Sequence, residues 1–158
     1  MKNYFVLNII LSIVWVMLSG DLSFFNGGFG FVLGFFIVWM ISYENKDLRY
    51  IKIVPRIISF IFYFMFQLIK ANLEVAFEVA TPNLYIKPGI VQIPLDAKSD
   101  LEITMLAHAV AITPGSLSLD VSEDKKYLYV HTMYVKDKQK YIDSIKNGFE
   151  KRIIKILR

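Results

Sequence analysis

The feature that most constrains this chain is an N-terminal stretch that carries almost no charge. Residues 1–43 contain only two charged side chains, Lys2 and Asp21, whereas residues 80–158 carry 12 of the 18 basic and 9 of the 14 acidic side chains. Charged side chains are costly in hydrocarbon, while a folded domain in water exposes many of them. The sequence therefore predicts a part embedded in a membrane, followed by a part in water.

Two apolar segments fill the charge-poor stretch. The 17 residues of Tyr4–Gly20 carry no charge, and this length is close to the minimum that crosses a hydrocarbon core of about 30 Å. A second apolar segment, Gly27–Tyr43, follows a short polar connection at residues 21–26. A cleavable signal peptide is the alternative for the first segment, but the second apolar run follows too closely to favour it. We expect residues 1–43 to form a transmembrane helical hairpin.

Three glycines mark one side of the second apolar segment. At about 100° per residue, Gly27, Gly30 and Gly34 fall within about 60° of one another on a helix. Gly30 and Gly34 also have the spacing that lets a second helix approach closely in a membrane. These glycines are our candidate helix-packing interface, with the first segment or a neighbouring subunit as the partner. The alternative is that they reflect only the general tolerance of membrane helices for glycine.

Residues 44–80 are expected to form a basic loop and an amphipathic helix. By the positive-inside rule, the basic residues of the loop place it and the N-terminus in the cytoplasm. The helix is expected over Pro55–Val79, where the uncharged run at 57–69 has only 13 residues, which is short for a span. We favour a helix that lies at the cytoplasmic membrane surface, and a third span is the alternative. The basic residues are Lys46, Arg49, Lys52 and Arg56.

Polar side chains gather along one side of this expected helix. All of its polar residues except Asn72 fall within about a 100° sector of a helical wheel. We interpret them as a stripe that contacts the membrane surface or a partner protein. The candidate residues of this polar stripe are Arg56, Gln67, Lys70, Glu74 and Glu78.

Residues 81–158 are predicted to form a small α+β domain in the cytoplasm. An extended segment at 84–93 contains a Pro-Gly pair, which is typical of an edge strand or a bulge rather than a central strand. Ser99 and Glu102 form a capping box that predicts a helix from Asp100. Ser116–Val121 alternates apolar and polar residues, and a polar turn joins it to a second strand at 126–134, so the two are expected to form a hairpin.

A last helix completes the order β-α-β-β-α. Asp137 is its expected cap, and the apolar residues recur at intervals of three or four, as on one face of a helix. These residues are Tyr141, Ile145, Phe149, Ile153 and Ile156. We therefore expect a two-layer domain in which helices cover one face of a mostly antiparallel sheet.

The residues give little support to catalysis or to metal binding. The chain has no Cys, which excludes disulfides, thiolate zinc sites and Cys nucleophiles. Ser116, Ser118, Asp120 and His131 are the best candidates for a hydrolase site, but they lack the strand-turn-helix motif that exposes a nucleophilic Ser. His108 and His131 are too far apart in sequence to form a typical metal-ligand pair. We expect no catalytic residue, no metal and no cofactor.

One group of aromatic residues suggests an interface. Tyr127, Tyr129 and His131 share one face of the second hairpin strand, because side chains alternate along a strand. Exposed aromatic residues usually mark a contact surface, so we treat these three as a candidate domain interface with the membrane, the helix at 55–79 or a partner subunit. The net charge of +4 is modest, and the positive-inside bias explains it without nucleic acid.

Several segments together resemble a known family. They look like the E subunit of the multisubunit Mrp-type Na+/H+ antiporter, and the resemblance extends over essentially the whole chain. Ser116 is one departure, because the family usually has Thr at that position, but both residues supply a hydroxyl. The segments are ANL at 71–73, IKPGIVQIP at 86–94, AITPGSLSLDV at 111–121, LYVH at 128–131 and FEKRI at 149–153.

The resemblance implies an accessory subunit in the plasma membrane of a bacterium. Such a subunit assembles with other membrane subunits of a monovalent cation/proton antiporter, and it binds no small-molecule substrate by itself. The ion-translocating charges of the family are ascribed to its large subunits, which agrees with the uncharged apolar segments here. We therefore expect a non-catalytic structural role in assembly or stability. A free-standing, membrane-anchored interaction or regulatory domain is the alternative, and a membrane-tethered hydrolase is a remote third.

Overall fold

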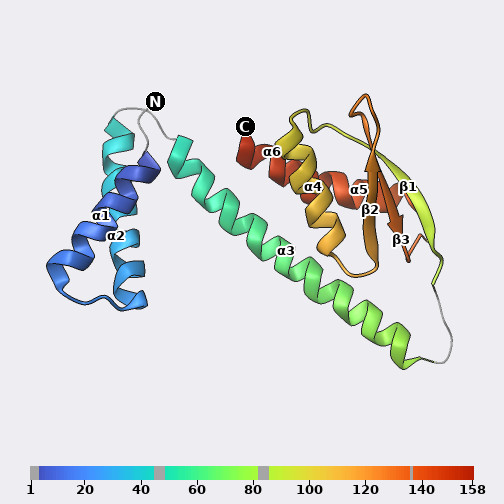
Figure 1. The fold of residues 1–158 in the computed structure, drawn as a ribbon, viewed down its shortest axis with the longest axis horizontal. Helices are drawn as coiled ribbons and strands as arrows, with labels where there is room; N and C mark the ends of the chain where they lie inside the picture. The colour runs from blue at the N-terminus through green and yellow to red at the C-terminus, as the bar shows by residue number, and fades with distance from the viewer. Residues whose placement is uncertain (1–3, 45–48, 82–85, 136) are drawn as a thin grey trace. The chain divides into compact units, whose positions relative to one another are not determined.

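The computed structural model describes residues 4–44, 49–81, 86–135 and 137–158, and these form two compact units (Figure 1). The first unit ends at Pro55 and the second begins at Arg56. This division differs from the expected boundaries after residues 43 and 80, because most of the third helix packs with the C-terminal domain. Lys46 of the expected basic loop and the first two residues of the expected strand at 84–93 lie outside the described residues.

The first unit is built on two antiparallel helices, α1 (Tyr4–Ser19) and α2 (Phe24–Glu44). Ser12 Oγ donates to the Gly27 carbonyl at 3.1 Å, and Trp15 Nε1 donates to Asn26 Oδ1 at 3.0 Å. The sequence placed the second helix from Gly27, but α2 begins three residues earlier. The reason is a cap, since Ser23 Oγ accepts from the Asn26 backbone N–H at 3.3 Å and satisfies one free donor of the first turn.

Helix α3 (Arg49–Ala80) has 32 residues and also begins earlier than the expected Pro55. Its first turns are held within the first unit, because Asn8 Nδ2 donates to the Tyr50 hydroxyl at 2.8 Å and the Tyr50 ring contacts Phe5 and Phe35. Pro55 lies inside the helix, where its missing N–H removes a single helical hydrogen bond. By length and composition, Phe24–Tyr43 and Tyr50–Ala80 are apolar enough to cross a membrane, whereas α1 is shorter.

The second unit contains the expected α+β domain. Its elements are β1 (Gly89–Pro94), α4 (Asp100–Ile112), β2 (Ser116–Val121), β3 (Tyr127–Thr132), α5 (Lys138–Ile145), a π-helical segment η1 (Lys146–Glu150) and α6 (Lys151–Leu157). The sheet order is β1-β3-β2, and both pairings are antiparallel. The β-α-β-β-α order and the edge position of the first strand are therefore confirmed.

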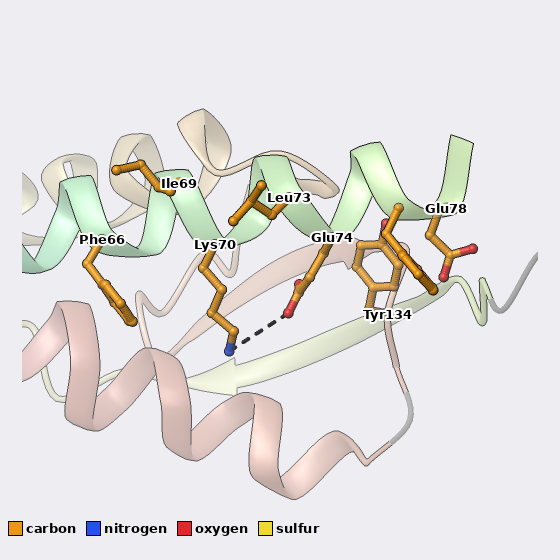
Figure 2. Close-up of a pocket in the computed structure, with 8 residues that line it drawn as sticks. Phe66, Ile69, Lys70, Leu73, Glu74, Glu78 and Tyr134 are labelled. Carbon is orange, nitrogen blue, oxygen red and sulfur yellow. Dashed lines mark ion pairs between the residues drawn. The ribbon is translucent and has the colours of Figure 1, made fainter. Parts of the chain in front are cut away.

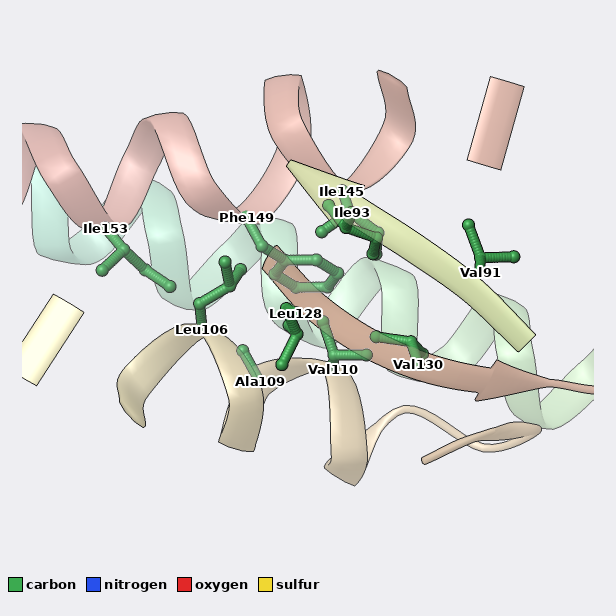
Figure 3. Packing of buried hydrophobic residues seen from close by; sticks show 10 residues of the cluster. All are labelled: Val91, Ile93, Leu106, Ala109, Val110, Leu128, Val130, Ile145, Phe149 and Ile153. Carbon is green, nitrogen blue, oxygen red and sulfur yellow. The ribbon is translucent and has the colours of Figure 1, made fainter. Parts of the chain in front are cut away.

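The core of the domain lies between the sheet and its helices (Figures 1 and 3). The strands contribute alternate residues to it, and α4 and the C-terminal helical segments contribute the other side, so the helices cover one face of the sheet. The buried residues are Val91, Ile93, Leu106, Ala109, Val110, Leu128, Val130, Ile145, Phe149 and Ile153.

The last helix is not the single regular helix that the spacing predicts. Residues Lys146–Glu150 form one π-helical turn between α5 and α6. This turn keeps Ile145, Phe149 and Ile153 in the core and also buries Glu150, whose Oε1 accepts from the backbone N–H groups of residues 96 and 97 at 2.6 and 3.0 Å. A buried carboxylate with these partners ties the loop after β1 to the helices.

The capping box at α4 is present as expected, and its Glu102 also has a hydrogen-bond partner outside the box. Glu102 closes the box with Ser99, and its carboxylate also accepts from Arg158 at 2.9 and 3.1 Å. Hydrogen bonds from Arg158 and from backbone N–H groups lower the pKa of Glu102 from 4.5 to about 2. The C-terminal residue is thereby joined to the first turn of α4.

We predict that Glu102→Gln destabilises the purified chain by about 1–3 kcal/mol at pH 7, because it replaces charge-assisted hydrogen bonds with neutral ones. The folded pKa lies below the unfolded one, so this stabilisation is complete above about pH 4.5 and is lost as the pH falls toward 2. Thermal unfolding in detergent, followed by circular dichroism, measures the difference. The exposed Glu123→Gln is the control, and equal unfolding of Glu102→Gln and wild type at pH 7 would contradict the prediction.

Candidate interaction surfaces

The three glycines of α2 lie toward α1 in the structure. A Cβ atom at Gly30 would come within 2.8 Å of Trp15 Cδ1, and one at Gly34 would overlap Asn8 Oδ1 and lie 3.2 Å from the Asn8 carbonyl oxygen. At Gly27 the nearest atom, Val16 Cγ2, is 4.0 Å away. Gly30 and Gly34 therefore allow the close approach of the two helices, while Gly27 is at ordinary contact distance.

The polar stripe of α3 faces the chain's own α+β domain. Arg56 Nη1 donates to the Lys155 carbonyl at 2.6 Å, and Gln67, Lys70 and Glu74 line a cavity of about 300 Å³ together with domain residues. Glu78 is buried. The sequence suggested the membrane surface or a partner protein for this stripe and did not consider the domain that follows it in the same chain.

Aromatic side chains hold α3 on the domain, in a contact that we call the Tyr63 clamp. The Tyr63 ring packs edge-on against Phe149 with 5.3 Å between ring centroids, and the guanidinium carbon of Arg152 lies 3.9 Å from the Tyr63 ring centroid. The Tyr63 hydroxyl occupies the space that a Cβ atom at Gly148 would take. The π-helical turn thus supplies the Phe149 ring that packs against Tyr63 and, at Gly148, the space for the Tyr63 hydroxyl.

The opposite side of α3 is apolar and exposed. With the polar stripe turned to the domain, the apolar residues face away from it, as the helical period requires. Members of this exposed apolar face are Ile58, Ile61, Phe62, Met65, Ile69, Leu73 and Phe77. A contiguous apolar surface of this kind marks a contact with lipid or with another protein.

A second exposed surface lies on the face of the sheet that the helices do not cover. Tyr127, Tyr129 and His131 of β3 point to this outer sheet face, and the register places Ile90 and Leu117 on either side of His131. Tyr127 is exposed and the other two β3 residues are half-buried. The three residues selected from the sequence therefore belong to one mixed aromatic and aliphatic surface.

The two serines of β2 point inward, whereas Asp120, beyond a bulge in the strand, is exposed. Ser118 Oγ donates to the Ala107 carbonyl of α4 at 2.8 Å, and Ser116 Oγ lies 3.1 Å from the Tyr141 hydroxyl of α5. Leu117 and Leu119 instead point to the outer sheet face and are 53% and 48% exposed. Leucine normally occupies the covered side of a strand, so this arrangement indicates that the outer sheet face is also a contact surface.

The candidate hydrolase residues do not come together. Ser116 and Ser118 face the helices, whereas His131 lies on the other side of the sheet. Asp120 accepts from the adjacent Val121 backbone N–H rather than from a histidine. Within the described residues there is no group of three or more His, Asp or Glu side chains placed to hold a metal ion. The arrangement suits contacts between surfaces better than acid–base chemistry.

Comparison with known proteins identifies the family. The family described as Na+/H+ ion antiporter subunit matches residues 8–156, which is nearly the whole chain. The chain belongs to this family. It is 34% identical over 151 residues to the E subunit of the Na(+)/H(+) antiporter of Alkalihalophilus pseudofirmus OF4, with 96% of each chain covered. It is also 34% identical over 153 residues to the corresponding E subunit of Bacillus subtilis 168, with 97% of each covered.

A solved structure resembles the chain over the same extent. A chain of the membrane-bound sulfane sulfur reductase, an archaeal respiratory membrane complex, is 28% identical and has a TM-score of 0.58, with 97% of this chain and 98% of that chain covered. The family match and the two antiporter relatives confirm the expected resemblance to the E subunit of a multisubunit Na+/H+ antiporter. The chain is a membrane protein of ion transport that combines apolar helices with an α+β domain.

We predict that Gly34→Ala lowers the stability of the first unit by about 1–3 kcal/mol, because the added methyl group overpacks the contact with Asn8. Gly28 is the matched control, since a Cβ atom there has nothing within 4 Å, and Gly28→Ala should leave stability unchanged or raise it slightly. Thermal unfolding of the purified chain in detergent, followed by tryptophan fluorescence, compares them. Equal unfolding of the two variants would show that α1 and α2 do not need this close approach.

Proposed function

We propose that this chain is a non-catalytic accessory subunit of a multisubunit Na+/H+ antiporter, in which it supports assembly or stability of the complex. The relatives named above are antiporter E subunits, and the similar archaeal chain belongs to a respiratory membrane complex. Both comparisons favour other membrane subunits as the partners of this chain. In this proposal, α1 and α2 form a transmembrane hairpin in the bacterial plasma membrane.

The structural role is supported chiefly by β2, in which the serines point toward the helices and the leucines are exposed. Two exposed leucines beside three aromatic residues do not stabilise a free-standing domain. Apolar area contributes a favourable free energy only when a partner removes it from water. The outer sheet face therefore acts as a docking surface for another subunit. Its residues are Ile90, Leu117, Leu119, Tyr127, Tyr129 and His131.

Charge placement argues against an ion path through this chain alone. Helix α1 has no charged residue, and α2 has only Glu44 at its last position. A path for protons or cations through a membrane normally requires acidic or basic side chains within it. The coupled transport therefore belongs to partner subunits, and this chain positions or stabilises them.

The orientation of α3 follows from its packing. Phe60, Tyr63 and Phe64 pack on the domain core next to Arg152 and Lys155. If α3 crossed the bilayer, these charged groups would enter hydrocarbon at a cost of several kcal/mol. We therefore favour α3 lying at the cytoplasmic membrane surface with its exposed apolar face in the interface. The N-terminus and the α+β domain are then both cytoplasmic.

We predict that Leu117→Ser combined with Leu119→Ser weakens assembly at least tenfold, since burial of each leucine contributes about 1.5–3 kcal/mol. Copurification of the other antiporter subunits with the tagged chain from membranes, in mild detergent, measures assembly. The variant itself should remain folded, because both side chains are exposed in the isolated chain.

Leu101→Ser is the matched control for this experiment. Leu101 is 59% exposed but lies on α4, on the covered side of the sheet. The proposal expects normal copurification for this control. If wild type brings down no antiporter subunit, the chain is instead the free-standing membrane-anchored domain. If the double variant assembles normally, the outer sheet face is not the docking surface.

A further inference from the structure

The exposed apolar face of α3 consists of two rows of side chains that differ in composition. In Figure 2, Ile69 lies on the side of α3 away from the domain, whereas Lys70 and Glu74 extend toward the domain. Ile69 belongs to the first row, whose five members are all large, apolar and exposed, and which we call the lipid row. Its residues are Phe62, Phe66, Ile69, Leu73 and Phe77. This row fits the membrane interface that we propose for α3.

The second row is turned by about 100° around the helix axis from the first, and it contains a polar residue. We call this row the Asn72 seam. Its residues are Ile61, Met65, Leu68, Asn72, Val75 and Val79. They are four, three, four, three and four residues apart, and Ile58 continues the alternation. Leu68 and Val75 are half-buried and the other members are exposed. Alternate steps of three and four form the heptad pattern with which one helix packs along another.

Asn72 is the member of the seam that separates a protein partner from lipid. Its Nδ2 donates to the Leu68 carbonyl of the same helix at 2.8 Å. This bond uses one of the two donors of the amide, so the second N–H and the oxygen are available to a partner. Hydrocarbon offers neither a donor nor an acceptor, and an amide removed from water without a hydrogen bond costs free energy. A polar group on a second helix can supply that bond.

The charge of the seam restricts the kind of helix that fits it. No member of the seam is acidic or basic, so the complementary surface is also uncharged. At 1.5 Å per residue, the seam extends over about 27 Å along α3. Heptad packing keeps two helices within about 20° of parallel or antiparallel. A partner of α3 at the membrane surface therefore lies along that surface as well, which is the position of an amphipathic helix.

We propose that the Asn72 seam packs against one amphipathic α-helix of another antiporter subunit, beside α3 at the cytoplasmic membrane surface. The Asn72 side chain forms a hydrogen bond with that helix and fixes its position along α3, as single polar residues do in apolar seams. The inference rests on the proposed function, which supplies the other subunits. It adds a second contact to the one proposed for the outer sheet face.

Photo-crosslinking in the assembled complex tests the seam. The photoreactive residue p-benzoylphenylalanine is placed singly at Ile61, Leu68 or Val75, and the complex that copurifies with the tagged chain is illuminated. Mass spectrometry then locates the adducts. We expect adducts with one other antiporter subunit, at sites that shift by about seven residues from each position to the next. Phe66 and Leu73 of the lipid row are 64% and 66% exposed and are the matched control positions, which should give little protein adduct.

Asn72→Leu tests the polar contact alone. The variant should copurify with about threefold to tenfold less of the crosslinked subunit, because it cannot make the hydrogen bond between the helices. The printed bond of Asn72 is to its own helix, and Leu is the better helix former, so the variant should unfold at the wild-type temperature or a higher one. Phe66→Leu in the lipid row is the control and should copurify normally.

The outcomes separate the seam from the proposed function. Equal protein adducts from the seam and the lipid row, adducts with lipid alone, or adducts with a second copy of this chain would each overturn the inference. Normal copurification of a folded Asn72→Leu variant would also overturn it. If the other subunits copurify with wild type but the seam forms no adduct with them, the inference fails and the proposed function stands. If wild type brings down no antiporter subunit, the proposed function fails and the inference fails with it.

Discussion

The contact of Tyr63 with Arg152, Phe149 and Gly148 determines what the rest of α3 can do. It fixes the rotation of the helix about its own axis, so that the polar stripe faces the domain and the apolar side faces away. Without the domain, the same sequence could serve as a membrane span, since Tyr50–Ala80 is long and apolar enough to cross. With the domain attached through the Tyr63 clamp, a span would take charged side chains into hydrocarbon.

Local signals in the sequence predicted much of the domain. The Ser99 and Glu102 capping box begins α4 as expected, and alternation with a polar turn gave the β2–β3 hairpin. These features depend on neighbours within a few residues. The partner of Glu102 could not be predicted in this way, because Arg158 lies at the other end of the domain and only the packing of α4 with α6 brings the two side chains together.

Features set by contacts between elements were not predictable from the pattern. Most apolar residues of the last helix recur every four residues. This spacing fits a regular α-helix as well as a helix that contains one wider π-helical turn, so the sequence did not reveal that turn. The polar stripe of α3 was expected to contact the membrane surface or a partner protein, yet it faces the domain that follows in the same chain. Alternation in β2 separated the leucines from the serines but did not show which side the helices cover, and the serines point inward. A bulge between Ser118 and Asp120 then breaks the alternation and places Val121 against the core, away from the side of the leucines.

We propose that α3 lies along the cytoplasmic membrane surface, so that both of its ends are on the same side. The chain has no Cys, so single cysteines at Lys52 and Lys140 can report the two ends, with Leu22→Cys in the α1–α2 connection as the external control. In intact cells, a membrane-impermeant maleimide should label the position 22 variant only, and in inside-out vesicles it should label the position 52 and 140 variants. Labelling of the position 140 variant from outside the cell would mean that α3 crosses the membrane and would contradict the account.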